Sequence, residues 1–177
     1  MRVIAGALRG RVLVAPPGRA TRPTSDRVRE ALVSILGDVS GLRVLDLFAG
    51  SGALAIEALS RGASEATMID SAQTAITTIR ANLASLGLDA QVHRQHALSF
   101  LRRAQAADWQ YDLVFLDPPY RSVSSFTSRL SSALLPILSP DARAVSESDR
   151  RAPLELNLPL LDERKYGDTL IRIHGTR

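Results

Sequence analysis

The spacing of apolar residues along the sequence changes repeatedly between residues 43 and 149. Short apolar runs such as RVLDLFAG, residues 43–50, are typical of buried strands, and they alternate with longer segments whose apolar residues recur at helical spacing. The pattern predicts strands at 43–50, 65–70, 90–95, 111–117 and 142–148, and helices at 52–62, 71–87, 97–105 and 125–138. Strands that alternate with helices in this way predict an α/β fold with a doubly wound, mostly parallel sheet.

Local signals set the expected ends of two helices. Ser71 is a plausible cap for the helix at 71–87, and Gly87 follows its end. Pro136 is expected to kink or end the helix at 125–138, because proline lacks a backbone N–H.

Both ends of the chain depart from the alternation. Residues 1–25 mix small, apolar and basic residues around several glycines and prolines, which predicts a short β-hairpin or an extended arm. A helix should follow, capped by Thr24 or Ser25 and ended by Gly37 or Gly41. At the other end, KYGDTLIRIHG predicts a turn and then a last strand. We therefore expect a basic hairpin or arm, residues 1–25, and one α/β domain, residues 26–177.

Positive charge is concentrated near the start of the chain. The whole sequence holds 22 basic residues against 18 acidic ones, and its pI is about 10.3. The first 29 residues contain a single acid, Asp26, and these arginines: Arg2, Arg9, Arg11, Arg19, Arg22, Arg27 and Arg29. A local field of this kind fits a polyanionic partner, although a basic tail without a partner is the alternative.

Composition excludes several other classes of site. The chain has no cysteine, so disulfides and cysteine-bound metals are excluded, and its three histidines give little reason to expect a metal site. No apolar run reaches the roughly 20 residues of a membrane span, and the N-terminus lacks the apolar core of a secretory signal. The expected compartment is the cytoplasm.

A glycine loop follows the first strand of the α/β pattern. FAGSGALA, residues 48–55, satisfies the G-x-G-x-x-G/A fingerprint, and Asp70 lies 20 residues after Gly50, where an acid can bind ribose hydroxyls. Asp46 lies inside the strand, where it would repel a pyrophosphate but could bind the ammonium group of S-adenosylmethionine. This favours S-adenosylmethionine over a nicotinamide cofactor. The alternatives are an Asp46 bonded to nearby backbone amides and an Asp70 that only caps a helix.

A second loop, Asp117-Pro118-Pro119-Tyr120, ends the strand at 111–117. Two prolines cannot continue a central strand, and they fix a rigid loop. Asp117 and the Pro118 carbonyl could accept the hydrogens of an amino group on a base, while Tyr120 could stack on the base or pack inward. The alternative is a Pro-Pro turn in which Asp117 caps the next helix. If the two strands are neighbours, both loops open on the same edge of the sheet.

Five segments together resemble one family: MRVIAGALRGR, RPTSDRVREAL, LDLFAGSGALAIEALSRGA, FLDPPY and VSES. Their order and spacing are similar to those of the 16S rRNA (guanine(966)-N(2))-methyltransferases over nearly the whole chain. The resemblance implies a class I S-adenosylmethionine fold of seven strands, with the last strand inserted antiparallel. It also implies methylation of the exocyclic N2 amine of one guanine in an assembling small ribosomal subunit, without a metal and by a protein that we expect to be monomeric.

The resemblance also implies residue roles by position. The S-adenosylmethionine-dependent methyltransferase domain would be residues 26–177, and the arm at 1–25 would bind RNA. The residues implied for the cofactor are Asp46, Phe48, Ala49, Gly50, Ser51, Gly52, Asp70, Ser71 and Ala97. Those implied for the base are Asp117, Pro118, Pro119 and Tyr120, and those for RNA are Arg2, Arg9, Arg11, Arg22, Arg27 and Arg29.

The sequence departs from the family pattern in three places. Asp70 stands where glutamate is common, and Ala97 follows His96 where class I enzymes often place an acid near the adenine amine. The helix after the fifth strand is expected to be short or missing, and Glu147 receives no role. Two other functions stay open from the sequence: a DNA amino-methyltransferase, and a non-catalytic RNA-binding factor for ribosome assembly.

Overall fold

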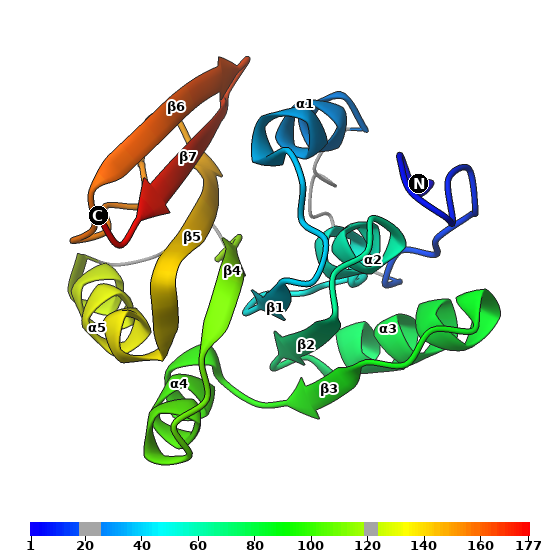
Figure 1. Cartoon of the computed structure of the whole chain (residues 1–177), viewed down its shortest axis with the longest axis horizontal. Helices are drawn as coiled ribbons and strands as arrows, with labels where there is room; N and C mark the ends of the chain where they lie inside the picture. Colours follow the sequence, from blue (N-terminus) through cyan, green and yellow to red (C-terminus); the bar gives the residue numbers. More distant parts are fainter. Residues whose placement is uncertain (18–25, 119–123) are drawn as a thin grey trace.

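Seven strands form one mixed sheet among the residues that the computed structural model describes, which are 1–17, 26–118 and 124–177 (Figure 1). Their order across the sheet is β3-β2-β1-β4-β5-β7-β6. The strands are β1 (Arg43–Asp46), β2 (Glu65–Asp70), β3 (Gln91–Arg94), β4 (Tyr111–Leu116), β5 (Leu138–Asp149), β6 (Leu160–Tyr166) and β7 (Thr169–Gly175). The first five pair in parallel, and β7 lies antiparallel between β5 and β6. The predicted fold class, with its inserted antiparallel last strand, is confirmed.

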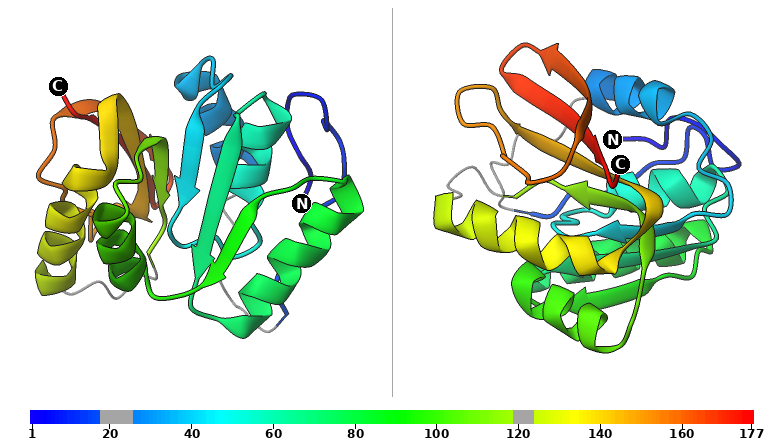
Figure 2. Two further views of the ribbon diagram at one scale, coloured as in Figure 1. Left: turned by 60° about the horizontal axis from the view of Figure 1, so that its bottom comes forward. Right: turned by 60° about the vertical axis from the view of Figure 1, so that its left-hand side comes forward.

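Helices cover both faces of this sheet (Figure 2). They are α1 (Asp26–Leu36), α2 (Ala53–Ser60), α3 (Gln73–Leu86), α4 (Ala97–Ala106) and α5 (Ser124–Leu134), followed by a 3-10 turn at Leu135–Ile137. Consecutive β1 residues serve opposite faces, since Val44 packs into the core with α1, α2 and α3 and Leu45 packs into the core with α4 and α5. This alternation within an apolar strand is what burial on both faces requires.

Three boundaries show how tertiary contacts modify the sequence pattern. Ser71 is not the cap of α3: Ala72 holds that position, and its N–H donates to Oδ1 of Asp70 at 2.9 Å. The kink or end expected at Pro136 is confirmed, because α5 passes into the 3-10 turn there. Residues 150–159, all of them described, contain no helix, which confirms the expected loss of the element after the fifth strand.

The first 17 residues include the predicted hairpin, in which Arg2 and Val12 form an antiparallel bridge. The hairpin lies beside α2 and α3 (Figure 1). Val3 and Leu13 are buried in the same core as α1, α2 and α3. The hairpin therefore packs on the α/β unit. The boundary proposed at residue 25 stays a prediction, because residues 18–25 lie outside the described part of the chain.

Buried side chains of α2 hold the hairpin through its backbone. Glu57 accepts hydrogen bonds from the N–H groups of Ile4 and Ala5 at 2.8 and 2.7 Å. The backbone at Gly6, with a φ of 81°, passes so close to α2 that a Cβ there would lie 1.9 Å from the carbonyl oxygen of Ser60. No helix within the described residues is long and apolar enough to cross a membrane.

Candidate active site

The carboxyl ends of β1 and β4 lie side by side at the centre of the sheet. The two strands pair in parallel with Asp46 opposite Phe115, and the N–H of Leu47 donates to the carbonyl of Phe115 at 3.2 Å. The two strands are therefore neighbours, which is the condition that the sequence analysis set for both loops to open on one edge. The glycine loop after β1 and the start of the Asp117-Pro118 loop after β4 open on one edge, where α/β sheets bind their ligands.

Two left-handed glycines shape the loop between β1 and α2. Gly50 has a φ of 54° and Gly52 a φ of 78°, and a Cβ at Gly52 would lie 3.0 Å from Sδ of Met68. Gly52 is the N-cap of α2 and has no side chain to cap the helix; in the first turn, the N–H of Ala55 bonds the carboxylate of Asp46. The first turn of α2 therefore presents backbone N–H groups that suit an anionic ligand group.

Asp70 clamps this loop from the end of β2. Its Oδ2 accepts a hydrogen bond from the N–H of Gly50 at 3.0 Å, while Oδ1 accepts the bond from Ala72. The carboxylate therefore lies at the glycine loop, where an acid at the end of the second strand can accept ribose hydroxyls. The structure thus combines the two interpretations of Asp70: it supports the start of α3, and it lies at the glycine loop where a ribose acid is expected.

Asp46 is a buried acid at this edge with a strongly raised pKa. It is 3% exposed, and burial raises its pKa to about 7, with the neighbouring charge of Asp70 adding to the effect. The N–H groups of Phe48 and Ala55 bond the carboxylate and lower the pKa in the opposite direction. Asp46 therefore does bond nearby backbone amides, as the alternative interpretation expected. These two hydrogen bonds lower its pKa by less than burial raises it. A cationic ligand group beside Asp46 would restore its ionised form.

The remaining cofactor residues surround the same loops. Ala49 and Ser51 are buried in the glycine loop, and the N–H of Ala49 donates to the carbonyl of Ile69 at 2.9 Å. Phe48 meets the ring of Phe126 in α5 edge to face, with centroids 6.4 Å apart. Ser71 is exposed directly after β2.

Ala97 follows β3, the strand that pairs with β2. It begins α4 and is buried. The N–H of Gln95, two residues earlier, donates to the carbonyl of Asp70 at 3.0 Å. The end of β3 is thereby placed beside the predicted ribose acid.

The base side of the site is described as far as Pro118. Asp117 is partly buried directly after β4, and Pro118 is buried. Pro119 and Tyr120 lie outside the described residues, so their stacking and shelf roles stay predictions.

The hairpin arginines lie on an exposed surface near the glycine loop. Arg2, Arg9 and Arg11 are all exposed. The guanidinium of Arg2 donates to the carbonyl of Gly10 at 2.8 Å, and that of Arg11 donates to the carbonyl of Ser85 at 3.0 Å. These bonds hold two of the charges at fixed places on the hairpin and beside the end of α3.

Arg29 requires a correction. We expected it to bind RNA, but in α1 it is only 1% exposed and belongs to the largest fully buried side chains. Its place on the inner face of an amphipathic helix, beside Val28 and near Leu32, keeps it from contacting phosphates. Arg22 and the side chain of Arg27 lie outside the described residues.

Sequence reasoning missed the residue that joins the hairpin to the cofactor loop. Asn82 of α3 is 1% exposed; its Oδ1 accepts the N–H of Val14 at 2.9 Å, and its Nδ2 donates to the carbonyls of Val14 at 3.0 Å and Ser51 at 2.9 Å. Nearby, Oγ of Ser51 lies 3.6 Å from Sδ of Met1. The available signal was a polar residue on the apolar face of a helix, as it was for Glu57 in ALAIEALS.

Comparison with known proteins agrees with this geometry. A family model described as conserved hypothetical protein 95 matches residues 1–175. The Bacillus subtilis protein YlbH, provisionally described as an rRNA methyltransferase, is 39% identical over 188 residues, and the match covers 100% of both chains. Ribosomal RNA small subunit methyltransferase D of Haemophilus influenzae is 35% identical over 182 residues, which cover 98% of this chain and 93% of the relative. The solved structure of the Escherichia coli protein yhhF, provisionally described as a methyltransferase, superposes with a TM-score of 0.82 at 35% identity over 99% of this chain and 97% of that one.

Proposed function

The chain belongs to the conserved hypothetical protein 95 family, and from that membership we propose that it methylates the exocyclic N2 amine of a guanine in 16S ribosomal RNA, with S-adenosylmethionine as methyl donor. Relatives described as ribosomal RNA small subunit methyltransferases support the class of reaction and of substrate. The observation that carries the proposal is the pairing of β1 with β4, which brings the loop after Asp46 and the loop beginning at Asp117 to one edge.

The residues after β1 and β2 fit the proposed cofactor. Asp46 suits the ammonium group of a methionine moiety, since its buried carboxylate lacks a countercharge strong enough to keep its pKa low. The N–H groups at the start of α2 suit the methionine carboxylate, and Asp70 suits the ribose hydroxyls. S-adenosylmethionine supplies an electrophilic methyl group at this edge of the sheet.

The residues after β4 would prepare the amine. The lone pair of a guanine amino group is delocalised into the ring and is a poor nucleophile. Asp117 and the carbonyl oxygen of Pro118 would accept the amino hydrogens and turn the lone pair toward the methyl group. As the N–C bond forms, the bond between the methyl group and the sulfonium sulfur would break, and its electron pair would stay on sulfur. The amine would pass one proton to Asp117, which leaves a neutral secondary amine. The rigid proline loop would orient the base before reaction.

The finer features of the substrate are also proposals. The guanine would have to be splayed from its helix to reach this edge, as enzymes that act on bases require. A chain of 177 residues offers little surface for reading a long RNA, so we propose an assembling small subunit, in the cytoplasm, as the substrate of a monomeric enzyme.

Replacement of Asp117 by alanine tests the proposed chemistry. We expect Asp117→Ala to bind S-adenosylmethionine with nearly wild-type affinity and to lose at least ~100-fold in the rate of methyl transfer to immature small subunits, the lower range for removing a positioned proton acceptor. Asp89→Ala, at an exposed acid before β3, is the matched control and should keep the wild-type rate. Wild-type turnover by Asp117→Ala would refute the mechanism. Methylation of duplex DNA, and none of the subunits, would refute the substrate.

A further inference from the structure

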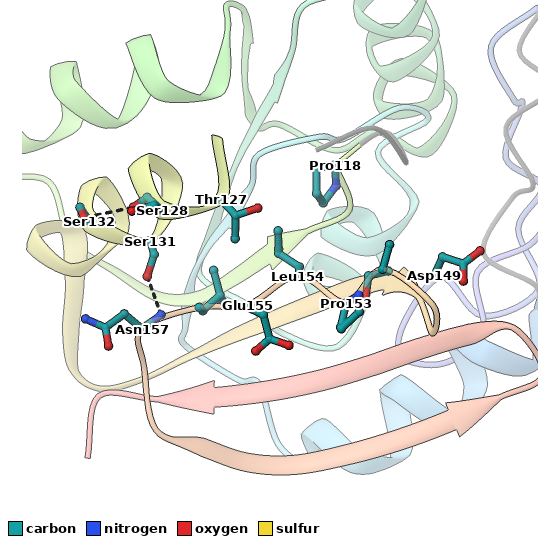
Figure 3. A pocket seen from close by; sticks show the side chains of 13 residues that line it. Pro118, Thr127, Ser128, Ser131, Ser132, Asp149, Pro153, Leu154, Glu155 and Asn157 are labelled. Carbon is teal, nitrogen blue, oxygen red and sulfur yellow. Dashed lines mark hydrogen bonds between the residues drawn. The ribbon is translucent and has the colours of Figure 1, made fainter. Parts of the chain in front are cut away.

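A cavity of about 620 Å³ opens beside the proposed base site, on the side away from the glycine loop. We define it as the α5 groove, lined by Pro118, Thr127, Ser128, Ser131, Ser132, Ser148, Asp149, Ala152, Pro153, Leu154, Glu155, Leu156 and Asn157. In Figure 3 the groove runs between α5 and the segment after β5, from Pro118 at one end to Ser131 and Asn157 at the other. Its volume lies within the range of about 300–1,000 Å³ that is usual for ligand sites.

Hydrogen bonds within the protein fix the walls of the groove. Oγ of Ser131, a buried residue, accepts a hydrogen bond from the N–H of Asn157 at 2.7 Å, which fixes the far end against α5. The N–H of Ala152 donates to the carbonyl of Asp149 at 2.9 Å and forms the turn at the other wall. Leu154 and Leu156 are buried beneath. The groove is therefore held by the fold between these contacts.

The chemistry of the lining favours a nucleobase over a phosphate. Five of the described lining residues carry hydroxyl groups, two carry carboxylates, and none of those described is an arginine or lysine. The carboxylate of Glu155 binds Arg172 at 2.8 Å, and Arg172 is shared with Glu163 at 2.9 Å. Acceptors of this kind suit the N–H and amino donors of a base, while the apolar sides of Pro118 and Pro153 can cover its faces.

One buried hydroxyl among the lining residues makes no hydrogen bond to the described part of the protein. Oγ of Ser148 is buried and has no hydrogen-bond partner among the described residues. Such a group costs stability unless a ligand or another partner satisfies it. A rotation about χ1 of Ser148 would offer this hydroxyl to a group in the groove that it lines.

We propose that the α5 groove binds the base of the nucleotide adjacent to the methylated guanine, and so acts as a second nucleotide pocket of the enzyme. Pro118 belongs to both places, because it follows Asp117 at the base site and lines the groove. An RNA strand splayed at the guanine would present its next base to this opening, with its phosphates outside the acidic lining. The inference rests on the proposed function and adds a determinant of substrate choice to it.

Filling the groove from α5 is the direct test. Ser128→Phe places a ring in the groove, and Ser125→Phe makes the same change at an exposed position of the same helix that does not line it. With immature small subunits from cells that lack the enzyme, we expect kcat/KM for the subunit to fall about tenfold for Ser128→Phe only, in line with the usual contribution of one bound base. The Kd for S-adenosylmethionine should not change. Equal rates for the two variants would overturn the proposal.

A smaller change guards against misfolding as the cause. Ser148→Ala removes the unpartnered hydroxyl without adding bulk, so its Tm should equal or exceed that of the wild type while kcat/KM for RNA falls about fivefold. A fall in Tm with unchanged kcat/KM would mean that the hydroxyl serves the fold alone, and would overturn the role given to Ser148.

A fluorescent base separates this inference from the proposed function. We would place 2-aminopurine on either side of the target guanine in RNA that is assembled into immature small subunits, and follow its fluorescence on binding of the enzyme. One of the two positions should respond with the wild type and with Ser125→Phe, and should not respond with Ser128→Phe. Turnover by the wild type without a response at either position would overturn the pocket and leave the methyltransferase intact. An absence of turnover by the wild type would instead refute the proposed function.

Discussion

Ionisation of Asp46 is costly because the side chain lies inside a parallel sheet, with Asp70 as a second negative charge nearby. The same burial makes it a sensitive acceptor for a cation, since a bound ammonium group would recover much of that cost. Burial also determines whether Arg29 can contact a ligand, but here it removes the side chain from the surface. A count of charges along the chain treats every arginine as exposed, whereas Arg29 lies on the inner face of α1. Charge pattern alone could not separate these two situations.

Cofactor binding should depend on pH through Asp46. With a pKa of about 7 in the unliganded protein, Asp46 must lose its proton to pair with an ammonium group. We therefore expect the affinity for S-adenosylmethionine to fall roughly tenfold or more from pH 7 to pH 5.5, measured by calorimetry. Asp46→Asn should bind more weakly at pH 7 and lose most of this dependence. A wild-type profile as flat as that of the variant would contradict the role of Asp46.

The same residue should change the stability of the unliganded protein in the opposite sense. The pKa of Asp46 rises from 3.8 in the unfolded chain to about 7 in the fold, so stability falls as the pH increases between these values. Asp46→Asn should therefore raise the Tm at pH 7.5 and have little effect near pH 4. Thermal melts at the two pH values check this, and a lower Tm for the variant at pH 7.5 would contradict it.

At the scale of elements, hydrophobic periodicity was enough to predict β1 to β5 and the helices between them, and the turn in KYGDTLIRIHG was enough to predict the last strand, β7. No range was predicted for β6. Periodicity reports the local face of each element and not where a helix or ladder begins and ends, so three ends were inaccurate. The strand predicted to run to residue 50 ends at Asp46, and Asp70 sets the start of α3. β5 begins at Leu138, opposite Tyr111 of β4, four residues before its predicted start. The docking of the N-terminal hairpin could not be predicted. It depends on side chains that bond backbone groups more than 50 residues away, such as Glu57 and Asn82.

Asn82 should couple the hairpin to the glycine loop. Asn82→Ala leaves Val14 and the carbonyl of Ser51 without their partner, so we expect a loss of roughly 2–4 kcal/mol in stability and weaker binding of S-adenosylmethionine. Hydrogen exchange should show faster exchange at Val14 than in the wild type. Thr77→Ala, at an exposed position of the same helix, is the control and should change none of these. Unchanged protection of Val14 in Asn82→Ala would exclude the coupling.

At the scale of the whole molecule, charge is arranged in two zones. The acids Asp46, Asp70 and Asp117 lie at the edge where the parallel strands end. The hairpin that carries the exposed arginines lies beside α2 and α3 (Figure 1). Phosphates are attracted to the second zone and are disfavoured at the first, whereas a base with amino donors is suited to the first. This division favours a bound RNA whose backbone follows the hairpin while one nucleotide enters the sheet edge.

The two zones predict a specific dependence of RNA binding on salt. Replacement of Arg2, Arg9 and Arg11 by glutamine should reduce the slope of log affinity against log salt by about 2 in magnitude, since each phosphate contact of a single strand contributes about 0.7. Affinity for S-adenosylmethionine should stay the same, because all three side chains are exposed and the guanidinium groups of Arg2 and Arg11 bond carbonyls of the hairpin and of α3. Replacement of Arg102, Arg164 and Arg177, three basic residues outside the hairpin, changes the net charge equally and should leave the slope nearly unchanged. Equal slopes for the two triple variants would mean that RNA responds to net charge alone and that the hairpin does not contact it.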